Sequence, residues 1–305
     1  MLIRERMEET RFSSAEKLLV EDICNHSEEL QYLTVQQIAQ RNFVHPSTLI
    51  RVAKKLGYHG WIELKEDFLA EERYLTKHFQ KIDANLPFLP TDGITTIAQK
   101  LTALEHSTLD DTLSLVQHDE LNQSKQLLLA SQQIKVFGSN ANRLISQDFL
   151  LKMNRIGKSA SQATPGEEAY EAFNMPPDSC GILISYTGEN HNLCQIATIL
   201  KKSAIPFIAI TSIGDNEISQ LATCSLKMTT RERLYSKIGN FSINTSVTYL
   251  LNLLYCCVFS ENYQQNLDHL IETGALIDKR PSTVAVMAET PIAKSIRLQD
   301  SFLPN

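Results

Sequence analysis

The stretch GILISYTGENHNLCQIATILKKSAIPFIAIT, residues 181–211, decides the fold of the larger part of this chain. Its apolar run GILISY (181–186) predicts a buried strand, HNLCQIATILKKS (191–203) predicts a helix with one apolar side, and PFIAIT (206–211) predicts a second strand. Two strands joined by a helix form a right-handed βαβ unit with parallel strands. The loop SYTGEN (185–190) follows the first strand and leads into the helix.

The same alternation continues on both sides of this unit. The other predicted elements are strands at 133–138, 159–164 and 224–230 and helices at 140–157 and 241–260, preceded by two helices near Ile94–His106 and Thr108–Ser131. Short apolar strands that alternate with helices predict an α/β domain, in which helices flank a parallel sheet.

The composition is that of a globular protein of more than one domain. The chain has 305 residues, of which 43% are hydrophobic, so two domains are expected. Its start, MLIRERMEET, has no apolar core of a signal peptide, and the apolar segment Val247–Phe259 is interrupted and too short to span a bilayer. We therefore expect a cytoplasmic protein with no membrane partner. Its six cysteines form no C-x-x-C pair, so we expect reduced thiols, no metal site and no cofactor.

The N-terminal part contains a neutral-to-basic window inside acidic surroundings. Leu30–Ile62 contains no Asp or Glu, whereas Arg41, Arg51, Lys54 and Lys55 lie within it. A surface that faces DNA phosphates requires such a charge distribution. The net charge of −6 argues against a protein that coats nucleic acid, but it says little about one local surface.

Helix signals in this window predict a helix-turn-helix. Thr34 and Gln37 have the spacing of a capping box, which begins a short helix at Val35–Arg41, and Asn42–His45 form the turn. His45 takes the N-cap of a second helix and Pro46 its first position; this helix runs to about Leu56, where Gly57 ends it. An earlier amphipathic helix is expected at Phe12–Cys24.

The two helices are predicted to share an apolar seam and to leave a polar outer face. The seam consists of Val35, Ile38, Ala39, Leu49, Val52, Ala53 and Leu56, and the outer face of Ser47, Thr48, Arg51 and Lys55. In a helix-turn-helix the N-terminal end of the second helix enters the major groove. The pattern alone also fits a plain αα-hairpin with a solvated basic face.

The run HPSTLIRVAKKLGYHGWIELK (45–65) resembles the N-terminal domain of the RpiR family of transcriptional regulators. The matching positions are Thr48, Arg51, Lys55, Leu56, Gly57, Tyr58, Gly60, Trp61, Leu64 and Lys65, whereas His45 stands where the family has a serine N-cap. The resemblance implies a double-stranded DNA operator as partner, contacted by His45, Ser47, Thr48, Arg51, Lys54 and Lys55. Trp61 is expected in the core.

Two loops, GSNAN (138–142) and SYTGEN (185–190), leave predicted strands and run into helix N-termini. Free N–H groups and the positive end of the helix dipole favour anions there. Neither loop contains Lys or Arg, so neutral donors would hold the anion. A local turn with an N-cap would need no ligand, but two such loops at neighbouring strand ends favour an anion site.

Residues 109–273 resemble the SIS phosphosugar-binding domain. SYTGEN matches its Ser-x-Ser-Gly-x-Thr loop, with Thr187 in place of a serine and Asn190 in place of a threonine. The first loop departs from Gly-x-Gly-x-Ser at Asn140, which tolerates positive φ, and at Asn142, which offers an amide donor. The resemblance implies a phosphorylated sugar effector, bound by Ser139, Asn140, Asn142, Ser185, Thr187, Gly188, Asn190 and Glu232.

Some SIS domains isomerise sugar phosphates with a carboxylate base. Glu232 lies roughly where that base would be, but it has arginine neighbours and fits a solvated charge cluster. We therefore expect no enzyme but a transcriptional regulator of carbohydrate metabolism genes whose SIS domain senses a phosphorylated sugar. The alternatives are a phosphosugar isomerase with an appended helical domain and a regulator whose effector site has decayed.

The expected organisation is a helix-turn-helix domain at 1–80, a linker and connecting helix at 81–108, a SIS domain at 109–275, and a tail at 276–305 with no assignable pattern. The stretch ANLPFLPTDG (84–93) is the expected hinge, with Leu86, Phe88 and Leu89 packed against a neighbour. Apolar residues nearly encircle the helix at 241–260, so we expect a homodimer or homotetramer; a fully buried core helix is the alternative.

Overall fold

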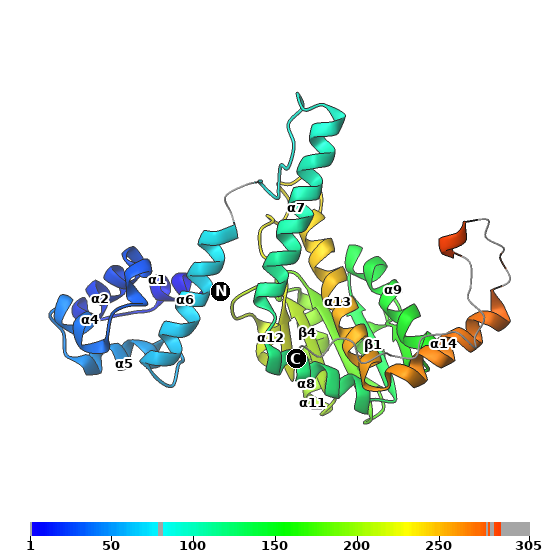
Figure 1. Ribbon diagram of the computed structural model, residues 1–305. Helices are drawn as coiled ribbons and strands as arrows, with labels where there is room; N and C mark the ends of the chain where they lie inside the picture. The colour runs from blue at the N-terminus through cyan, green and yellow to red at the C-terminus, as the bar shows by residue number, and fades with distance from the viewer. Residues whose placement is uncertain (1, 79–81, 279, 281–283, 288–305) are drawn as a thin grey trace, which may run out of the picture.

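The computed structural model describes residues 2–78, 82–278, 280 and 284–287, and it consists of a helical N-terminal domain followed by an α/β domain (Figure 1). The expected two-domain fold class is confirmed, including the parallel sheet. All five predicted strands are present, as β1 (Gln133–Gly138), β2 (Ser159–Gln162), β3 (Ser179–Ser185), β4 (Phe207–Thr211) and β5 (Cys224–Lys227). They pair in parallel in the order β2-β1-β3-β4-β5.

The N-terminal domain is a cluster of helices around one apolar core. Its helices are α1 (Ile3–Glu9), α2 (Ser14–Asn25), α3 (Ser27–Leu30), α4 (Val35–Arg41), α5 (Pro46–Lys55) and α6 (Trp61–His78). The bounds of α4 and α5 agree with the sequence prediction, whereas α1, α3 and α6 were not predicted. Leu19, Ile38, Leu49 and Phe68 fill the core, and Trp61 is buried among them as expected.

Helices cover both faces of the sheet. They are α7 (Ile94–Leu115), α8 (His118–Ala130), α9 (Ala141–Arg155), α10 (Glu168–Phe173), α11 (His191–Lys202), α12 (Glu217–Leu221), α13 (Phe241–Glu261) and α14 (Tyr263–Ile277), followed by a 3-10 turn at Ala285–Met287. Because strand side chains alternate, Ile182 and Ile208 pack with α8, α9 and α13, whereas Leu183 and Phe207 pack with α11 and α12 on the other face.

The predicted break near residue 107 is wrong, because α7 runs unbroken to Leu115. Thr108 and Thr112 are fully buried in this helix, and their hydroxyls lie 3.1 and 2.8 Å from those of Ser242 and Ser246 on α13. These hydroxyl contacts with α13 explain why polar residues are buried at this point of α7, where the sequence predicted a break. The chain turns at Val116 and Gln117 instead.

The linker packs through Asn85 rather than through its leucines. Leu86 and Leu89 are exposed, contrary to the prediction, whereas Phe88 is half-buried and Asn85 is buried. The Asn85 side-chain oxygen accepts from Arg233 N at 2.6 Å, and its backbone carbonyl accepts from Ile238 N at 2.9 Å. These bonds attach the linker to the segment at 228–240, which we call the 228–240 loop.

Helix α13 lies in the core of the α/β domain, where it contacts α7, α8 and α9 (Figure 1). With 21 residues it is long and apolar enough to cross a membrane by length and composition, but 44% of its most apolar window is buried within the protein. The sequence prediction that the apolar segment Val247–Phe259 is too short to span a bilayer was therefore wrong, because the helix that contains it is longer. By contrast, α14 has no buried residue, and of the predicted tail only residues 276–278, 280 and 284–287 are described.

Candidate functional site

The two predicted effector loops begin side by side at the carboxyl edge of the sheet. Strands β1 and β3 are neighbours, with Gly138 opposite Ile184, and Asn142 Nδ2 donates to Ile184 O at 3.3 Å. β2 follows β1 in the chain and pairs with it on the side away from β3, whereas β4 follows β3 and pairs with it on the side away from β1. The direction in which strands are added to the sheet therefore reverses between β1 and β3. Open parallel sheets bind ligands at such a point of reversal, outside the strand ends.

The GSNAN loop has the backbone conformation that was predicted for it. Asn140 has φ 51°, so the positive φ expected at this position is confirmed. Ser139 and Asn140 are exposed, and Asn142 is half-buried because its amide reaches across to β3. Two polar side chains of this loop therefore remain open to solvent.

The SYTGEN loop is held by its own side chains. Ser185 Oγ accepts from Gly188 N, Thr187 Oγ1 from Glu189 N, and Asn190 Oδ1 from Leu193 N, each at 3.2 Å. These are the contacts of a local turn and an N-cap. In two of these contacts the hydroxyl oxygens of Ser185 and Thr187 are the acceptors. The hydroxyl protons of these two residues can therefore still be directed to an anion.

Gly188 is required by close packing. Its φ is +67°, and a Cβ at this position would lie 1.9 Å from Asn216 Oδ1. Its carbonyl also accepts from Ile218 N at 3.2 Å, so the SYTGEN loop is pressed against the start of α12. Gly188 and Ser185 are buried and support the loop, whereas Thr187 is half-buried and Asn190 is exposed. Which of them contact an effector stays a prediction.

Glu232 is buried, so the expectation of a solvated charge cluster was wrong. Its Oε1 accepts from Ser242 N at 2.6 Å and from Ile243 N at 3.2 Å, which caps the first turn of α13. Its Oε2 lies 3.0 Å from Lys237 Nζ. The sequence did not show this because the cap belongs to a helix that begins after a loop of irregular structure.

The 228–240 loop brings a cation to the effector edge that sequence analysis missed. Tyr186 of the SYTGEN loop donates its hydroxyl to Glu232 O at 2.7 Å, and Lys237 Nζ lies 5.6 Å from the centre of the Tyr186 ring. Lys237 thus stands beside the loop that was expected to hold an anion with neutral donors alone. Two cations of this loop are paired: Lys237 with Glu232 at 3.0 Å, and Arg231 with Asp111 at 3.1 Å.

The helix-turn-helix forms as its capping residues predict. Thr34 Oγ1 accepts from Gln37 N at 3.3 Å, and Gln37 Oε1 accepts from Thr34 N at 2.8 Å, so the capping box is confirmed. At the start of α5, His45 Nδ1 accepts from Ser47 N at 3.3 Å, and after its end Gly57 has φ +90°. We call α5 the recognition helix.

Thr48 does not lie on the outer face of the recognition helix, contrary to the prediction. It is 5% exposed, because it is four residues before Val52 and therefore shares the inward side of the helix with it. His45, Ser47, Arg51, Lys54 and Lys55 are exposed. Ser47 and the cations therefore form the outer face that can meet DNA, with His45 at its start.

A carboxylate from outside the acid-free window reaches the recognition helix. Glu16 of α2 is buried; its Oε2 lies 2.7 Å from Lys55 Nζ, and its Oε1 lies 3.5 Å from Arg51 Nε. The hydrogen bond from Lys55, together with one from the Ser13 backbone, lowers the pKa of Glu16 to about 2. Lys55 is therefore partly neutralised and attached to α2.

Comparison with known proteins agrees with this geometry. Residues 1–73 match the helix-turn-helix domain of the rpiR family, and residues 127–256 match the SIS domain. The chain combines an rpiR-family helix-turn-helix domain with a SIS domain. An uncharacterized HTH-type transcriptional regulator of Clostridium perfringens is 25% identical to it over 280 residues, 91% of this chain and 99% of the relative. One of Caldanaerobacter subterraneus is 20% identical over 270 residues, 88% of this chain and 94% of the relative.

Solved structures share the fold of this chain. The Vibrio vulnificus NanR protein, complexed with ManNAc-6P, has a TM-score of 0.55 and 19% identity and covers 90% of this chain and 97% of its own. The sugar isomerase domain of an RpiR transcription factor from Sphaerobacter thermophilus has a TM-score of 0.52 and 16% identity, covering 58% of this chain and 98% of its own.

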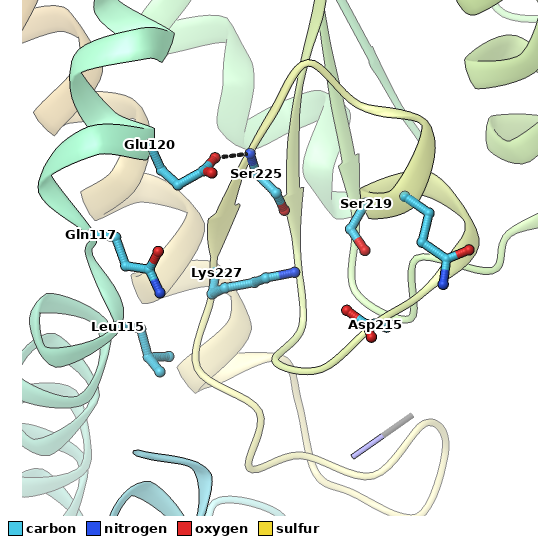
Figure 2. Close-up of a pocket in the computed structure, with 8 residues that line it drawn as sticks. Leu115, Gln117, Glu120, Asp215, Ser219, Ser225 and Lys227 are labelled. Carbon is cyan, nitrogen blue, oxygen red and sulfur yellow. Dashed lines mark hydrogen bonds between the residues drawn. The ribbon is translucent and has the colours of Figure 1, made fainter. Parts of the chain in front are cut away.

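A separate polar hollow of about 220 Å³ lies beside the edge strand β5 (Figure 2). It is lined by Leu115, Gln117, Glu120, Asp215, Ser219, Gln220, Ser225 and Lys227. Glu120 accepts from Ser225 N at 2.6 Å, and burial lowers the pKa of Lys227, whose amine donates to Gly214 O at 3.2 Å. None of the eight predicted effector residues, all of which the structure describes, lines this hollow.

The residue Asp215 also connects the two domains. Its Oδ2 lies 2.9 Å from Nη1 of Arg6 on α1. Arg6 in turn donates to Leu56 O at 3.2 Å and to the Tyr58 hydroxyl at 2.7 Å, just past the recognition helix. Neither residue was singled out from the sequence, because nothing local marks an ion pair between distant segments.

Proposed function

We propose that this protein is a DNA-binding regulator of carbohydrate metabolism genes, acting in the cytoplasm, whose SIS domain senses a phosphorylated sugar. The observation that carries the proposal is the β1–β3 register, which puts the GSNAN and SYTGEN loops next to each other in a chain that also has a helix-turn-helix. The complex of the NanR protein with ManNAc-6P supports a phosphosugar as effector.

The anion would be held by mainly neutral donors at this edge. Ser139, Asn140 and Asn190 are exposed there, Asn142 and Thr187 are half-buried, and two helices, α9 and α11, begin at the loops. A phosphate at the start of a helix is favoured by the helix dipole. Lys237 also lies beside Tyr186, where its charge is balanced by Glu232.

The same edge argues for sensing rather than catalysis. An isomerase needs a carboxylate that can take a proton from the sugar. Glu232, the candidate for this role, instead caps α13 through two backbone N–H groups and pairs with Lys237. A carboxylate committed to three donors serves the fold.

A connected set of contacts would carry the effector signal to DNA. The SYTGEN loop touches Asn216 and Ile218 through Gly188, the neighbouring Asp215 pairs with Arg6, and Arg6 holds the carbonyl of Leu56 at the end of the recognition helix. An effector that moves the SYTGEN loop would thereby change the restraint on the DNA-binding domain. It must bind two states with different affinity for this to happen.

The regulator works as a homodimer or homotetramer. One helix-turn-helix makes few base contacts, and such domains bind as dimers to half-sites about one helical turn apart. Helix α14 has no buried residue, and Leu276 and Ile277 at its end are 78% and 77% exposed, which leaves apolar surface for a second copy. Sedimentation at micromolar concentration tests this, and a monomer that still binds operator under effector control would contradict it.

Fluorescence anisotropy on duplex DNA from the promoter of the protein's own gene tests the function. Addition of ManNAc-6P, and then of a panel of other sugar phosphates, is expected to change the operator affinity. The same sugars are incubated with the protein in an isomerase assay, in which no turnover is expected. Turnover of any of them without an effect on DNA binding would favour the phosphosugar isomerase instead.

A further inference from the structure

Phe43, in the turn between α4 and the recognition helix, combines two features that a folded protein normally avoids. Its side chain is 97% exposed. Its φ is +53°, a conformation that is rare for a bulky residue because the Cβ crowds the backbone. Phe43 therefore gains nothing from burial and is strained as well.

The strain follows from how α4 ends. Phe43 N donates to Gln40 O at 3.2 Å, and Val44 N donates to Ala39 O at 2.9 Å. These two bonds define a Schellman motif in which Phe43 holds the C′ position, where glycine is preferred because it has no Cβ. The fold calls for glycine here, yet the chain has a phenylalanine. Neither burial nor backbone conformation accounts for a phenylalanine at this position.

The position of Phe43 indicates what it contacts. It lies three residues before Pro46, the first residue of the recognition helix, and two residues before the exposed His45. This is the end of a helix-turn-helix that enters the major groove. No acidic residue lies from Leu30 to Ile62 in the sequence, and the carboxylates of Asp22 and Glu29, which reach this turn from outside, are paired with Arg41 there.

We propose that Phe43 is a base-contacting residue, whose ring packs against thymine methyl groups in the major groove of the operator. Apolar contact with the thymine methyl is a recognised form of direct readout, and it distinguishes T from C without a hydrogen bond. The strained turn is then what pushes the ring out of the protein and toward the bases. This inference rests on the proposed DNA-binding function and adds a specificity determinant to it.

The first test is Phe43→Gly in the full-length chain, with a duplex that the wild-type protein has selected from a random-sequence library. Glycine relieves the positive φ, so the melting temperature is expected to rise. Affinity for the selected duplex is expected to fall roughly tenfold, because an apolar base contact is lost. Stability is thus expected to rise while affinity falls, whereas misfolding would lower both. A lower melting temperature would show that the ring supports the fold and would overturn the proposal.

The chain offers a matched control in Ala204, which has φ +54° in the same motif at the end of α11. Ala204 N donates to Lys201 O at 3.3 Å, and Ile205 N donates to Leu200 O at 2.9 Å. Ala204→Gly is expected to raise the melting temperature in the same way and to leave DNA affinity unchanged. An equal loss of affinity in this variant would assign the effect to backbone flexibility and contradict a role for the ring.

The second test removes the partner group from the DNA. Deoxyuridine replaces each thymine of the selected duplex in turn, which deletes only the methyl group. At the contacted position the substitution is expected to weaken wild-type binding but to have no further effect on Phe43→Gly. If the wild-type protein binds the selected duplex, but deoxyuridine at each thymine position weakens binding of the wild-type protein and of Phe43→Gly equally, the methyl contact is refuted. If the wild-type protein selects no duplex at all, the proposed function itself fails.

Discussion

A single carboxylate, that of Glu16, attaches the recognition helix to α2. It is buried and accepts hydrogen bonds from Lys55 Nζ and from Ser13 N, both of which favour its charged form. Its pKa is therefore about 2 in the folded protein, against an ordinary value of 4.5. Since a depressed pKa stabilises the fold only while the group is charged in the folded state, this contribution is present above pH 4.5 and is lost as the pH falls toward 2.

Glu16→Gln should accordingly lower the melting temperature of the N-terminal domain at about pH 7, and the difference from wild type should shrink on acidification to about pH 2.5. Calorimetry at several pH values measures this. Glu21→Gln, an exposed change on the same helix, is the control and should have little effect. A difference for Glu16→Gln that does not depend on pH would show that shape rather than charge matters.

Thr187 carries the second prediction at this scale. Thr187→Val keeps the side-chain volume and deletes the hydroxyl, so affinity for a sugar phosphate should fall by about 1–2 kcal/mol with little change in stability. Thermal shift on titration with ManNAc-6P measures both quantities. Thr198→Val removes a half-buried hydroxyl that donates within α11 and should leave the affinity unchanged. Full stabilisation of Thr187→Val by the ligand would mean that the hydroxyl only serves the turn.

At the scale of elements, the recognition helix is held from one side and free on the other. Glu16 and the apolar seam hold the inner side, while the Arg51 side chain is 63% exposed. Its Nε lies 3.5 Å from Glu16, a distance at which the pair adds little to stability. Arg51 can therefore turn toward DNA without disturbing the packing of α5.

Arg51→Ala should weaken operator binding by about 1–3 kcal/mol if Arg51 contacts a guanine, and the response to effector should persist. Anisotropy titrations at one salt concentration measure the loss. Arg155→Ala removes an exposed arginine from α9 in the other domain and serves as the control. Unchanged affinity for Arg51→Ala would remove this residue from the interface.

At the scale of the whole molecule, Arg6 and Asp215 join the DNA-binding domain to the SIS domain. The Asp215 side chain is 51% exposed, so we expect its ion pair to contribute little to stability, at most about 1 kcal/mol. Its position matters more, because Asp215 precedes Asn216, which packs against Gly188 of the SYTGEN loop.

Asp215→Asn should leave operator affinity without effector nearly unchanged and should reduce the factor by which ManNAc-6P alters it. The ratio of the two dissociation constants is the measurement. Asp148→Asn breaks an exposed ion pair on α9 and should leave this ratio as it is in wild type. A full response in Asp215→Asn would show that the signal takes another route, such as a change in subunit packing.

The sequence by itself determined what depends on neighbours a few residues apart. Thr34 with Gln37, Pro46 and Gly57 set the ends of α4 and α5 correctly, because caps and periodicity act within about one helical turn. The alternation of strands and helices in the second half likewise predicted the parallel sheet. It also put both effector loops at the same edge, since the ends of parallel strands must coincide.

Only the tertiary structure decided which groups meet across long separations. Glu16 reaches Lys55 although the window around Lys55 is free of acids in sequence. Glu232 became a cap for α13, Lys237 came to lie beside Tyr186, and Arg6 met Asp215. A charge does not specify its partner in the sequence, because any opposite charge will serve. The packing of the helices and the sheet selects the partner, and thereby separates the residues that hold the fold from those left to bind.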